Sequence, residues 1–223
     1  MAEILSNETG WRGSREAWLS GAYEALLESG VEAVRIMPLA KRLKLSRTSF
    51  YWFFSDRQEV LDALVALWRD KNTGNLIKQS KAYAESVAEA ILNVFDCWLD
   101  RTLFDSPLEY AMRSWALQSA GIAAEIVAAD DKRITAMTHM FIHHGYAELE
   151  ADVRARTIYL TQIGYISMNT RETLATRMHR IPKYVEIFTG RVPAKQELDR
   201  FFARHGYTES AGRVPRSKRV AGR

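Results

Sequence analysis

The chain has 223 residues, of which 47% are hydrophobic and 26% charged, and its formal net charge is +4. This length can bury one or two cores, and the absence of an apolar run near about 18 residues predicts no membrane-spanning helix. A single cysteine, Cys97, excludes an intrachain disulfide, and it sits in an apolar helical stripe that predicts a buried thiol. The acidic start of the chain shows no signal-peptide pattern, so we expect a cytoplasmic protein.

Positive charge is concentrated in two segments. From Arg35 to Arg57 there are six cations and one acid, and from Gly212 to Arg223 there are five cations and no acid. The remainder of the chain is net acidic. Because a phosphate backbone attracts basic patches of this kind, the distribution favours a polyanionic partner.

Apolar residues recur at spacings of three and four along most of the chain, which predicts an all-α protein of roughly nine helices. The first helix is expected from Ser14 to Ser29, with Trp18 and Leu26 on its apolar face and Gly30 as its stop. A short helix from Pro38 to Leu43 follows, since proline is favoured at the first helical position, where its missing N–H costs nothing.

Capping residues mark the next helices. Ser46 is suited to cap a helix from Arg47 to about Phe53. Ser55 and Gln58 form a capping-box pattern that opens a further helix. The segment Asn72–Asn75 ends or bends that helix, and it is the candidate boundary between a small N-terminal domain and a larger helical one.

The remaining helices are expected at 81–104, from a cap at Ser106, and at about 121–144, 148–172, 174–188 and 194–205. The predicted division is therefore a small helical domain at 12–71, a larger helical domain at 75–205, and a basic, disordered tail at 206–223. The tail either adds nonspecific DNA affinity or is inert. Its deletion lowers the salt dependence of DNA binding in the first case only.

Two short helices around a tight turn, at about 35–54, match a helix-turn-helix. Leu39 and Leu43 can face the core, which leaves the second helix free to meet DNA. An arginine such as Arg47 pairs bidentately with guanine, and hydroxyl side chains bond base edges, while tyrosine and arginine also suit phosphates. The predicted DNA contacts are Met37, Pro38, Lys44, Arg47, Thr48, Ser49, Tyr51, Trp52 and Arg57.

Residues 12 to 70 resemble the TetR family of transcriptional regulators. The resemblance rests on Ile36–Leu43, on Leu45–Phe54 and on the Ser55–Leu61 segment that follows. Its most specific feature is the pattern Ser-x-x-x-[Leu/Phe]-Tyr-x-x-Phe, which here ends at Phe54. Three positions depart from the family. Lys44 stands where Gly is frequent, Thr48 where Gly or Pro is frequent, and Phe53 where a histidine often touches phosphate.

The resemblance implies an all-α homodimer that reads a palindromic operator in successive major grooves about 34–36 Å apart. It also implies a C-terminal ligand pocket whose occupation changes the spacing of the two recognition helices, and a repressor that needs no cofactor and no metal. An all-α enzyme or small-molecule carrier is the alternative. The sequence shows no nucleophile triad, phosphate loop or closed metal signature that would support an enzyme.

Large apolar side chains are candidates for the lining of the ligand pocket. Gln162, Asn169 and Arg113 are candidate polar groups that would anchor the ligand. Ordinary core packing is the alternative for each of them. As a set they favour a bulky, hydrophobic effector. The predicted lining is Trp98, Tyr110, Met112, Trp115, Met137, Met140, Phe141, Gln162, Tyr165, Met168 and Asn169.

Residues 155–188 are the candidate dimer interface, with intrachain core as the alternative. Gly164 inside a helix costs up to about 1 kcal/mol relative to Ala unless close packing uses it. His139 and His143 lie four apart, which is a chelating spacing on a helix, and His144 follows them. Because no third ligand is identifiable, we expect no metal.

Overall fold

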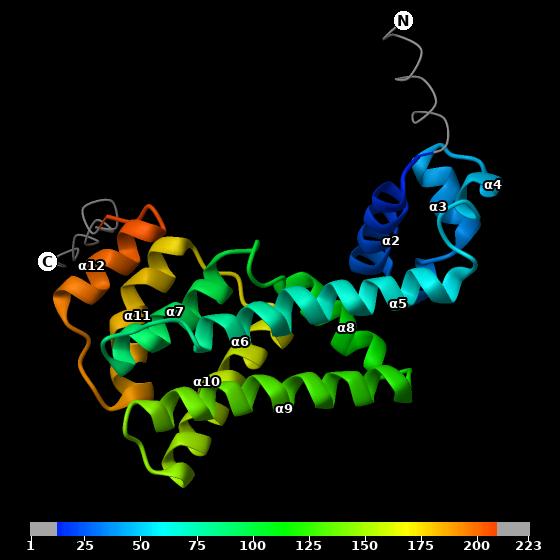
Figure 1. Ribbon diagram of the computed structural model, residues 1–223. Coiled ribbons are helices and arrows are strands. Elements are labelled where there is room, and N and C mark those ends of the chain that lie inside the picture. Colours follow the sequence, from blue (N-terminus) through cyan, green and yellow to red (C-terminus); the bar gives the residue numbers. More distant parts are fainter. Residues whose placement is uncertain (1–12, 209–223) are drawn as a thin grey trace, which may run out of the picture. The chain divides into compact units, whose positions relative to one another are not determined.

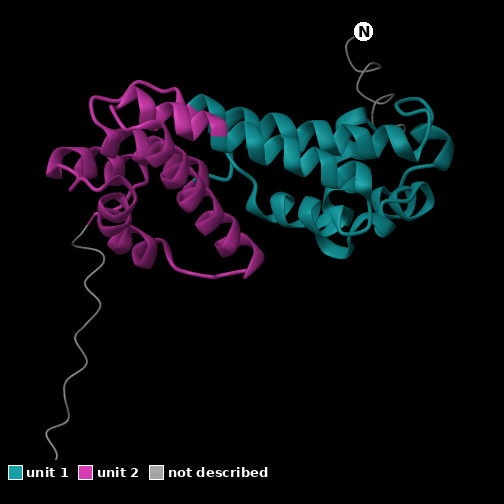
Figure 2. Cartoon of the chain, turned by 90° about the horizontal axis from the view of Figure 1, so that it is seen from below, with its two compact units in different colours: residues 1–78, 100–134 teal, residues 79–99, 135–223 magenta. Residues whose placement is uncertain are grey.

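The computed structural model describes residues 13–208, and every regular element in that range is helical (Figure 1), which confirms the all-α prediction. The described helices form two compact units (Figure 2), one of residues 13–78 and 100–134 and the other of residues 79–99 and 135–208. The elements are α2 (Arg15–Ser29), η1 (Val31–Ala33), α3 (Ile36–Leu43), α4 (Arg47–Phe50), α5 (Arg57–Trp68), η2 (Arg69–Gly74), α6 (Asn75–Ser80), α7 (Val87–Leu99), α8 (Ser106–Ala116), α9 (Ala120–His143), α10 (Glu148–Ser167), α11 (Leu174–Thr189) and α12 (Lys195–Arg204).

Helix α2 begins and ends as its sequence predicts. The Ser14 hydroxyl accepts a hydrogen bond from the backbone N–H of Ala17 at 3.1 Å, which satisfies one of the unpaired donors of the first turn. Gly30 ends the helix with φ 79°, a left-handed value that glycine adopts at little cost. The apolar face that includes Trp18 and Leu26 is buried.

Helix α3 begins at Ile36, two residues before the predicted start. Pro38 still lies in the first turn, where its missing N–H would have had no helical partner, so the earlier start breaks no hydrogen bond. The following helix is shorter than predicted. It covers Arg47–Phe50, is capped by Ser46, and gives way to turns before Phe54.

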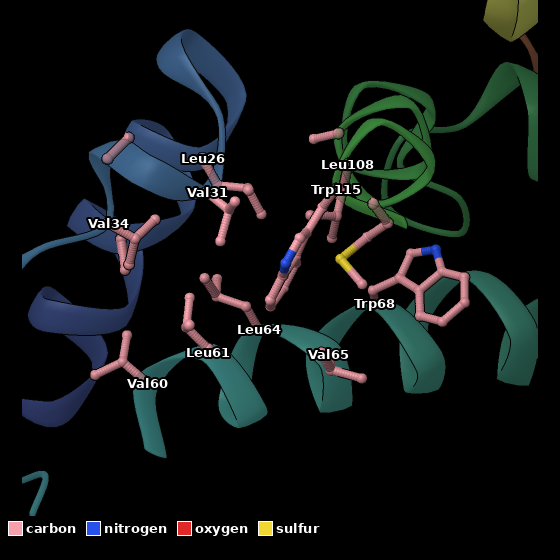
Figure 3. Close-up of a cluster of buried hydrophobic side chains, with 14 of the residues drawn as sticks. Leu26, Val31, Val34, Val60, Leu61, Leu64, Val65, Trp68, Leu108 and Trp115 are labelled. Carbon is pink, nitrogen blue, oxygen red and sulfur yellow. The ribbon is translucent and has the colours of Figure 1, made fainter. Parts of the chain in front are cut away.

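The core of the first unit is built by α2, α3, α4, α5 and α8 together (Figure 3). Leu64 and Trp68 of α5 pack with Leu108 and Trp115 of α8, and the first three of these are fully buried. Burial of each large apolar side chain contributes about 1.5–3 kcal/mol. The unit that carries the helix-turn-helix thus takes in residues 100–134 and is larger than the predicted 12–71.

Helix α5 does not stop at the predicted boundary. It continues through the π-helical stretch η2 into α6, and this stretch turns Asn72 and Thr73 inward, where both are buried. Asn72 donates to the Asp105 carbonyl at 3.1 Å and to Glu109 at 3.0 Å. The segment therefore continues the helix, and the chain passes from the first unit to the second further along α6, after Lys78.

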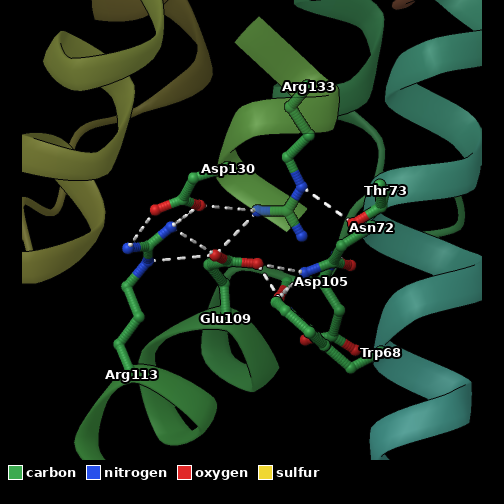
Figure 4. Close-up of polar contacts among 8 residues, drawn as sticks. All are labelled: Trp68, Asn72, Thr73, Asp105, Glu109, Arg113, Asp130 and Arg133. Carbon is green, nitrogen blue, oxygen red and sulfur yellow. Dashed lines mark hydrogen bonds and ion pairs between the residues drawn. The ribbon is translucent and has the colours of Figure 1, made fainter. Parts of the chain in front are cut away.

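Buried charges surround η2 (Figure 4). Arg133 and Glu109 are both fully buried and pair at 2.9 Å, and Arg133 also donates to Thr73 at 2.9 Å. Trp68 donates its indole N–H to Glu109 at 2.7 Å. Burial opposes ionisation of Glu109, but the nearby charges of Arg133 and Arg113 and their hydrogen bonds hold the pKa of its carboxyl below the usual value.

In the second unit, α7 packs against α11 and α12, and α10 packs against α11. Cys97 of α7 is fully buried, as its apolar stripe predicts. Helix α7 begins at Val87, later than the predicted Lys81. At the next predicted start the cap is Asp105, one residue earlier than Ser106, and its carboxylate accepts from Leu108 N–H at 3.0 Å.

The predicted basic tail lies almost wholly outside the described residues. Its first residues follow α12, where the backbone N–H of Tyr207 donates to the Phe202 carbonyl at 2.9 Å. Within residues 13–208, no helix combines the length and the apolar character that crossing a bilayer requires.

Candidate DNA-facing surface and ligand cavity

Buried aromatic rings fix the orientation of α4. Phe50 is fully buried, meets the Trp18 ring edge-on at a centroid distance of 5.2 Å, and stacks on Phe54 at 5.6 Å. Because one side of the helix is held in the core, the side that carries Arg47 and Thr48 faces outward, and both residues are exposed. Phe50 and Phe54 therefore help to hold this small domain together.

Around this helix lies an exposed patch of rings and cations, which we call the recognition surface. Tyr51 is 47% and Trp52 65% exposed, unusually high values for large aromatic side chains. Arg47 donates to the Tyr51 hydroxyl at 3.2 Å, and its guanidinium carbon lies 5.8 Å from the centre of that ring. The exposed members of the predicted contact set are Met37, Pro38, Lys44, Arg47, Thr48, Tyr51 and Trp52.

The assignment of Ser49 to base edges is corrected by its burial. Ser49 is only 3% exposed, and its hydroxyl donates to the Ser46 carbonyl at 2.9 Å. Its backbone N–H in turn donates to the Ser46 hydroxyl at 3.2 Å. Ser49 therefore closes the cap of α4 and does not reach the recognition surface.

The assignment of Arg57 to a phosphate is also corrected. Its guanidinium donates to the carbonyl of Val34 at 2.5 Å and to that of Val31 at 2.8 Å. These carbonyls belong to the segment that follows α2, so Arg57 ties the start of α5 to it. The side chain acts within the domain.

Half of the six cations between residues 35 and 57 are already engaged within the unit. Arg35 pairs with Glu32 at 2.9 Å, and Arg42 pairs with Glu28 at 2.6 Å. With Arg57 on backbone carbonyls, the exposed cations of this segment that form no ion pair within residues 13–208 are Lys41, Lys44 and Arg47. The attraction for a polyanion is therefore centred on the turn and on the start of α4.

A cavity lies in the second unit between α7, α10 and α11. About 480 Å³ of it is free of protein atoms, part of this open to solvent. Its walls are mainly aromatic and aliphatic, with a few polar groups. It is lined by Phe95, Trp98, Leu99, Ile158, Thr161, Gln162, Tyr165, Glu172, Arg177, Ile181, Tyr184 and Phe188.

Several polar groups of this cavity are incompletely satisfied. The buried indole N–H of Trp98 has no hydrogen-bond partner among the described residues, which costs on the order of 1–3 kcal/mol. The half-buried Arg177 donates to the Trp98 carbonyl at 3.1 Å. Burial lowers the pKa of the Arg177 guanidinium, while Glu172 opposes this change. Arg177 therefore keeps N–H groups that the acceptor atoms of a ligand can bind.

Three of the eleven predicted pocket residues, Trp98, Gln162 and Tyr165, line this cavity. Three others belong to the first unit: Met112 and Trp115 are core residues there, and Tyr110 is half exposed. Arg113, which the sequence suggests as a polar contact for the ligand, instead forms ion pairs with Glu109 and Asp130. The remaining five do not line the cavity either. Met137, Met140 and Phe141 are buried in the core of the second unit, and Met168 and Asn169 are exposed just after α10.

The sequence interpretation missed the side chains that α11 contributes. Arg177, Ile181, Tyr184 and Phe188 recur at intervals of four, three and four, which is the signature of one helical face. The segment was assigned as a whole to a dimer interface. Splitting it into two faces, one inward and one outward, would have found the cavity wall.

The histidines of α9 form no metal site in the described part of the chain. There, no three side chains of histidine, cysteine, aspartate or glutamate come together as a possible ligand set. His143 and His144 instead lie edge to face with ring centres 5.4 Å apart. Burial, and then the neighbouring His143, lower the pKa of His144.

An outward-facing, cation-bearing second helix in a helix-turn-helix is the arrangement of a DNA-binding domain. Comparison with known proteins supports this class of domain. The family model described as bacterial regulatory proteins of the tetR family matches residues 19–64. This segment of the first unit is therefore similar to the DNA-binding domain of TetR-family regulators.

Two curated relatives are similar to this chain over part of their length. The chain is 30% identical over 81 residues to the uncharacterized HTH-type transcriptional regulator YdeS of Bacillus subtilis, across 34% of this chain and 41% of that protein. It is 29% identical over 76 residues to the tetracycline repressor protein class G of Vibrio anguillarum, across 34% and 36% of the two chains. The chain thus matches less than half the length of either relative.

Similarity of fold extends further than similarity of sequence. The solved structure of a transcriptional regulator from Rhodococcus sp. Rha1 superposes with a TM-score of 0.52, over 85% of this chain and 96% of that one. Sequence identity is 19%, so this likeness concerns the fold alone. Ligand and assembly have to be argued from the residues of this chain.

Proposed function

We propose that the chain is a ligand-responsive repressor that binds palindromic operator DNA as a homodimer and is released by a small, mainly hydrophobic effector. The recognition surface carries this proposal. It combines exposed rings with the exposed cations Lys44 and Arg47 on the outward side of a helix-turn-helix. Exposed aromatic side chains beside cations fit a partner that offers both phosphates and apolar groove edges.

Each exposed side chain has a role that suits its chemistry. Arg47 exchanges its contact with the Tyr51 hydroxyl for a guanine edge, and Thr48 meets a neighbouring base or a thymine methyl group. Tyr51 and Lys44 meet phosphates, which set the position of the helix in the major groove. Trp52 lies along the groove wall.

A row of exposed apolar side chains on α10 supports the homodimer. Leu149, Val153 and Leu160 are 77%, 54% and 60% exposed, and their spacing puts them on one face of the helix. Ile187 of α11 is 63% exposed. Gly164 continues the same face, and a side-chain carbon built there would touch nothing within 4 Å in the described part of the chain. A second copy of this face would cover the row.

Operator binding tests the proposal. We expect operator DNA selected from a random pool by the full chain to bind less tightly to Arg47→Ala and Tyr51→Ala, each by about 1–3 kcal/mol, because a base or phosphate contact is lost. Arg47→Ala also relaxes the base preference at one position of each half-site. Fluorescence anisotropy of labelled DNA measures both effects.

Tyr83→Ala is the matched control, since Tyr83 is 84% exposed and lies in the second unit. Its affinity for the operator should equal that of the unaltered chain. Unchanged affinity of Arg47→Ala and Tyr51→Ala, with their helical content intact, would contradict the recognition surface as the DNA-binding element.

A further inference from the structure

The cavity of the second unit holds one cation whose charge is not balanced. Glu172 is the single acid among the lining residues of the described chain, and its carboxylate pairs with Arg180. Arg177 forms no ion pair within residues 13–208. When Arg180, the partner of Glu172, is counted with the lining residues, the net charge is +1 and is located on Arg177.

The unsatisfied polar groups of the cavity are mainly donors. A guanidinium has five N–H groups in a planar fork, and that of Arg177 makes one hydrogen bond to the described chain, to the Trp98 carbonyl. The Trp98 indole N–H adds another unpartnered donor. Gln162 is only 7% exposed, and its amide makes no hydrogen bond to residues of the described range. These groups call for a ligand with acceptor atoms and negative charge.

The walls around Arg177 are aromatic. The rings of Phe95 and Trp98 lie 5.3 Å apart at an angle of 40°, and those of Tyr184 and Phe188 stack at 5.4 Å and 17°. Phe95 also meets Phe188 edge-on at 6.4 Å. Together these rings offer faces and edges against which a flat aromatic ring of a ligand can pack.

We propose that the effector is a small aromatic carboxylate, whose ring lies against Phe95, Trp98 and Phe188 and whose carboxylate pairs with Arg177. Guanidinium and carboxylate match as planar, bidentate partners. The space of about 480 Å³ includes open solvent, so it sets only an upper limit on the size of the ligand. The role as effector rests on the function proposed above, whereas binding rests on the cavity alone.

Two pairs of probes that share a ring and differ in charge test the ligand class: benzoate with benzamide, and cinnamate with cinnamamide. Calorimetric titration of the full chain without DNA should show at least one carboxylate binding about tenfold or more tightly than its amide. Arg177→Met should remove this preference, and Arg177→Lys should keep most of it. Arg171→Met, which removes an exposed cation outside the cavity lining, should leave it unchanged.

Carboxylates that bind no better than their amides would overturn the inference, as would a preference that survives in an Arg177→Met variant of unchanged melting temperature. The comparison of probes on the unaltered chain does not depend on how any variant folds.

A second titration adds the tighter carboxylate to the chain bound to its selected operator. Release supports the effector role, and binding without release keeps the ligand class but counts against the ligand response. If the chain binds its operator but binds carboxylates no more tightly than amides, the ligand inference is wrong and the proposed DNA binding is not affected.

Discussion

At the scale of single residues, Lys44 combines a strained backbone conformation with a proposed phosphate contact. This residue ends α3 with φ 56° and ψ 37°, the left-handed conformation that glycine adopts most easily. A side chain there costs roughly 1–2 kcal/mol. An exposed lysine nevertheless stands at this turn, next to the recognition helix. The strain is compatible with a cation that acts on a phosphate.

Lys44→Gly should stabilise the chain and weaken DNA binding together. Relief of the left-handed strain exceeds the added entropy of the unfolded chain by about 0.5–1 kcal/mol, which raises the melting temperature by a few degrees. Loss of a phosphate contact lowers the slope of log affinity against log salt by about 0.9. Lys41→Gly removes the same charge inside α3 and should lower the melting temperature. A lower melting temperature for Lys44→Gly would contradict the strain argument.

Arg57→Ala should act on stability and leave the salt slope unchanged. The variant leaves the carbonyls of Val31 and Val34 without their charged donor, at a cost of about 1.5–3 kcal/mol. Urea unfolding measures this cost, and operator titrations at several salt concentrations, well below the melting temperature, measure the slope. Gln58→Ala, at an exposed neighbouring position, is the control. Unchanged stability with a slope lowered by about one would instead assign Arg57 to a phosphate.

At the scale of elements, the buried pair of Glu109 and Arg133 joins α8 to α9, and Thr73 and Asn72 join η2 to both. A fully buried pair is weak evidence for net stabilisation, because desolvation offsets attraction. Removal of one partner is different, since it leaves the other charge buried and uncompensated. The pair therefore makes this junction sensitive to pH.

Glu109→Gln should lower the free energy of unfolding at neutral pH by about 3–5 kcal/mol. Because the pKa of Glu109 lies below its usual value of 4.5, its stabilising effect is present above that pH and is lost as the pH falls through the folded-state pKa. The difference between the unaltered chain and the variant should therefore narrow in acid. Urea titrations from neutral pH downward measure it. Glu125→Gln, which breaks the exposed pair with Arg69, should change stability by less than about 1 kcal/mol.

How far the sequence predicts these elements depends on what fixes them. Caps and apolar spacing are local, so α2 and the helix-turn-helix are found close to their true limits. The inward turn of Asn72 is not local, because the partners that hold it, Asp105 and Glu109, lie more than thirty residues further along the chain. The same holds for Arg57, whose acceptor carbonyls belong to Val31 and Val34, more than twenty residues earlier in the chain.

At the scale of the whole molecule, the proposed dimer depends on the exposed row of α10. Leu160→Glu should raise the dimer dissociation constant about a hundredfold, because a twofold interface loses the buried leucine twice and gains two buried charges. Size-exclusion chromatography with light scattering measures the mass at several concentrations.

Leu117→Glu is the control for this change, since Leu117 is 88% exposed and lies in the first unit. It should leave the mass unchanged. A Leu160→Glu variant that keeps the mass of the unaltered chain, or a chain that is monomeric from the outset, would rule out this face as the interface.

The π-helical stretch η2 restricts which changes of length the chain tolerates. Each residue of an α-helix advances the helix by about 100°. Deletion of one residue among 69–71 would therefore turn the side chains that follow it relative to α5 by about that angle, and insertion would turn them the opposite way. Asn72 and Thr73 would no longer face Glu109 and Arg133. Homologous chains should accept substitutions along this helix more readily than any change in its residue count.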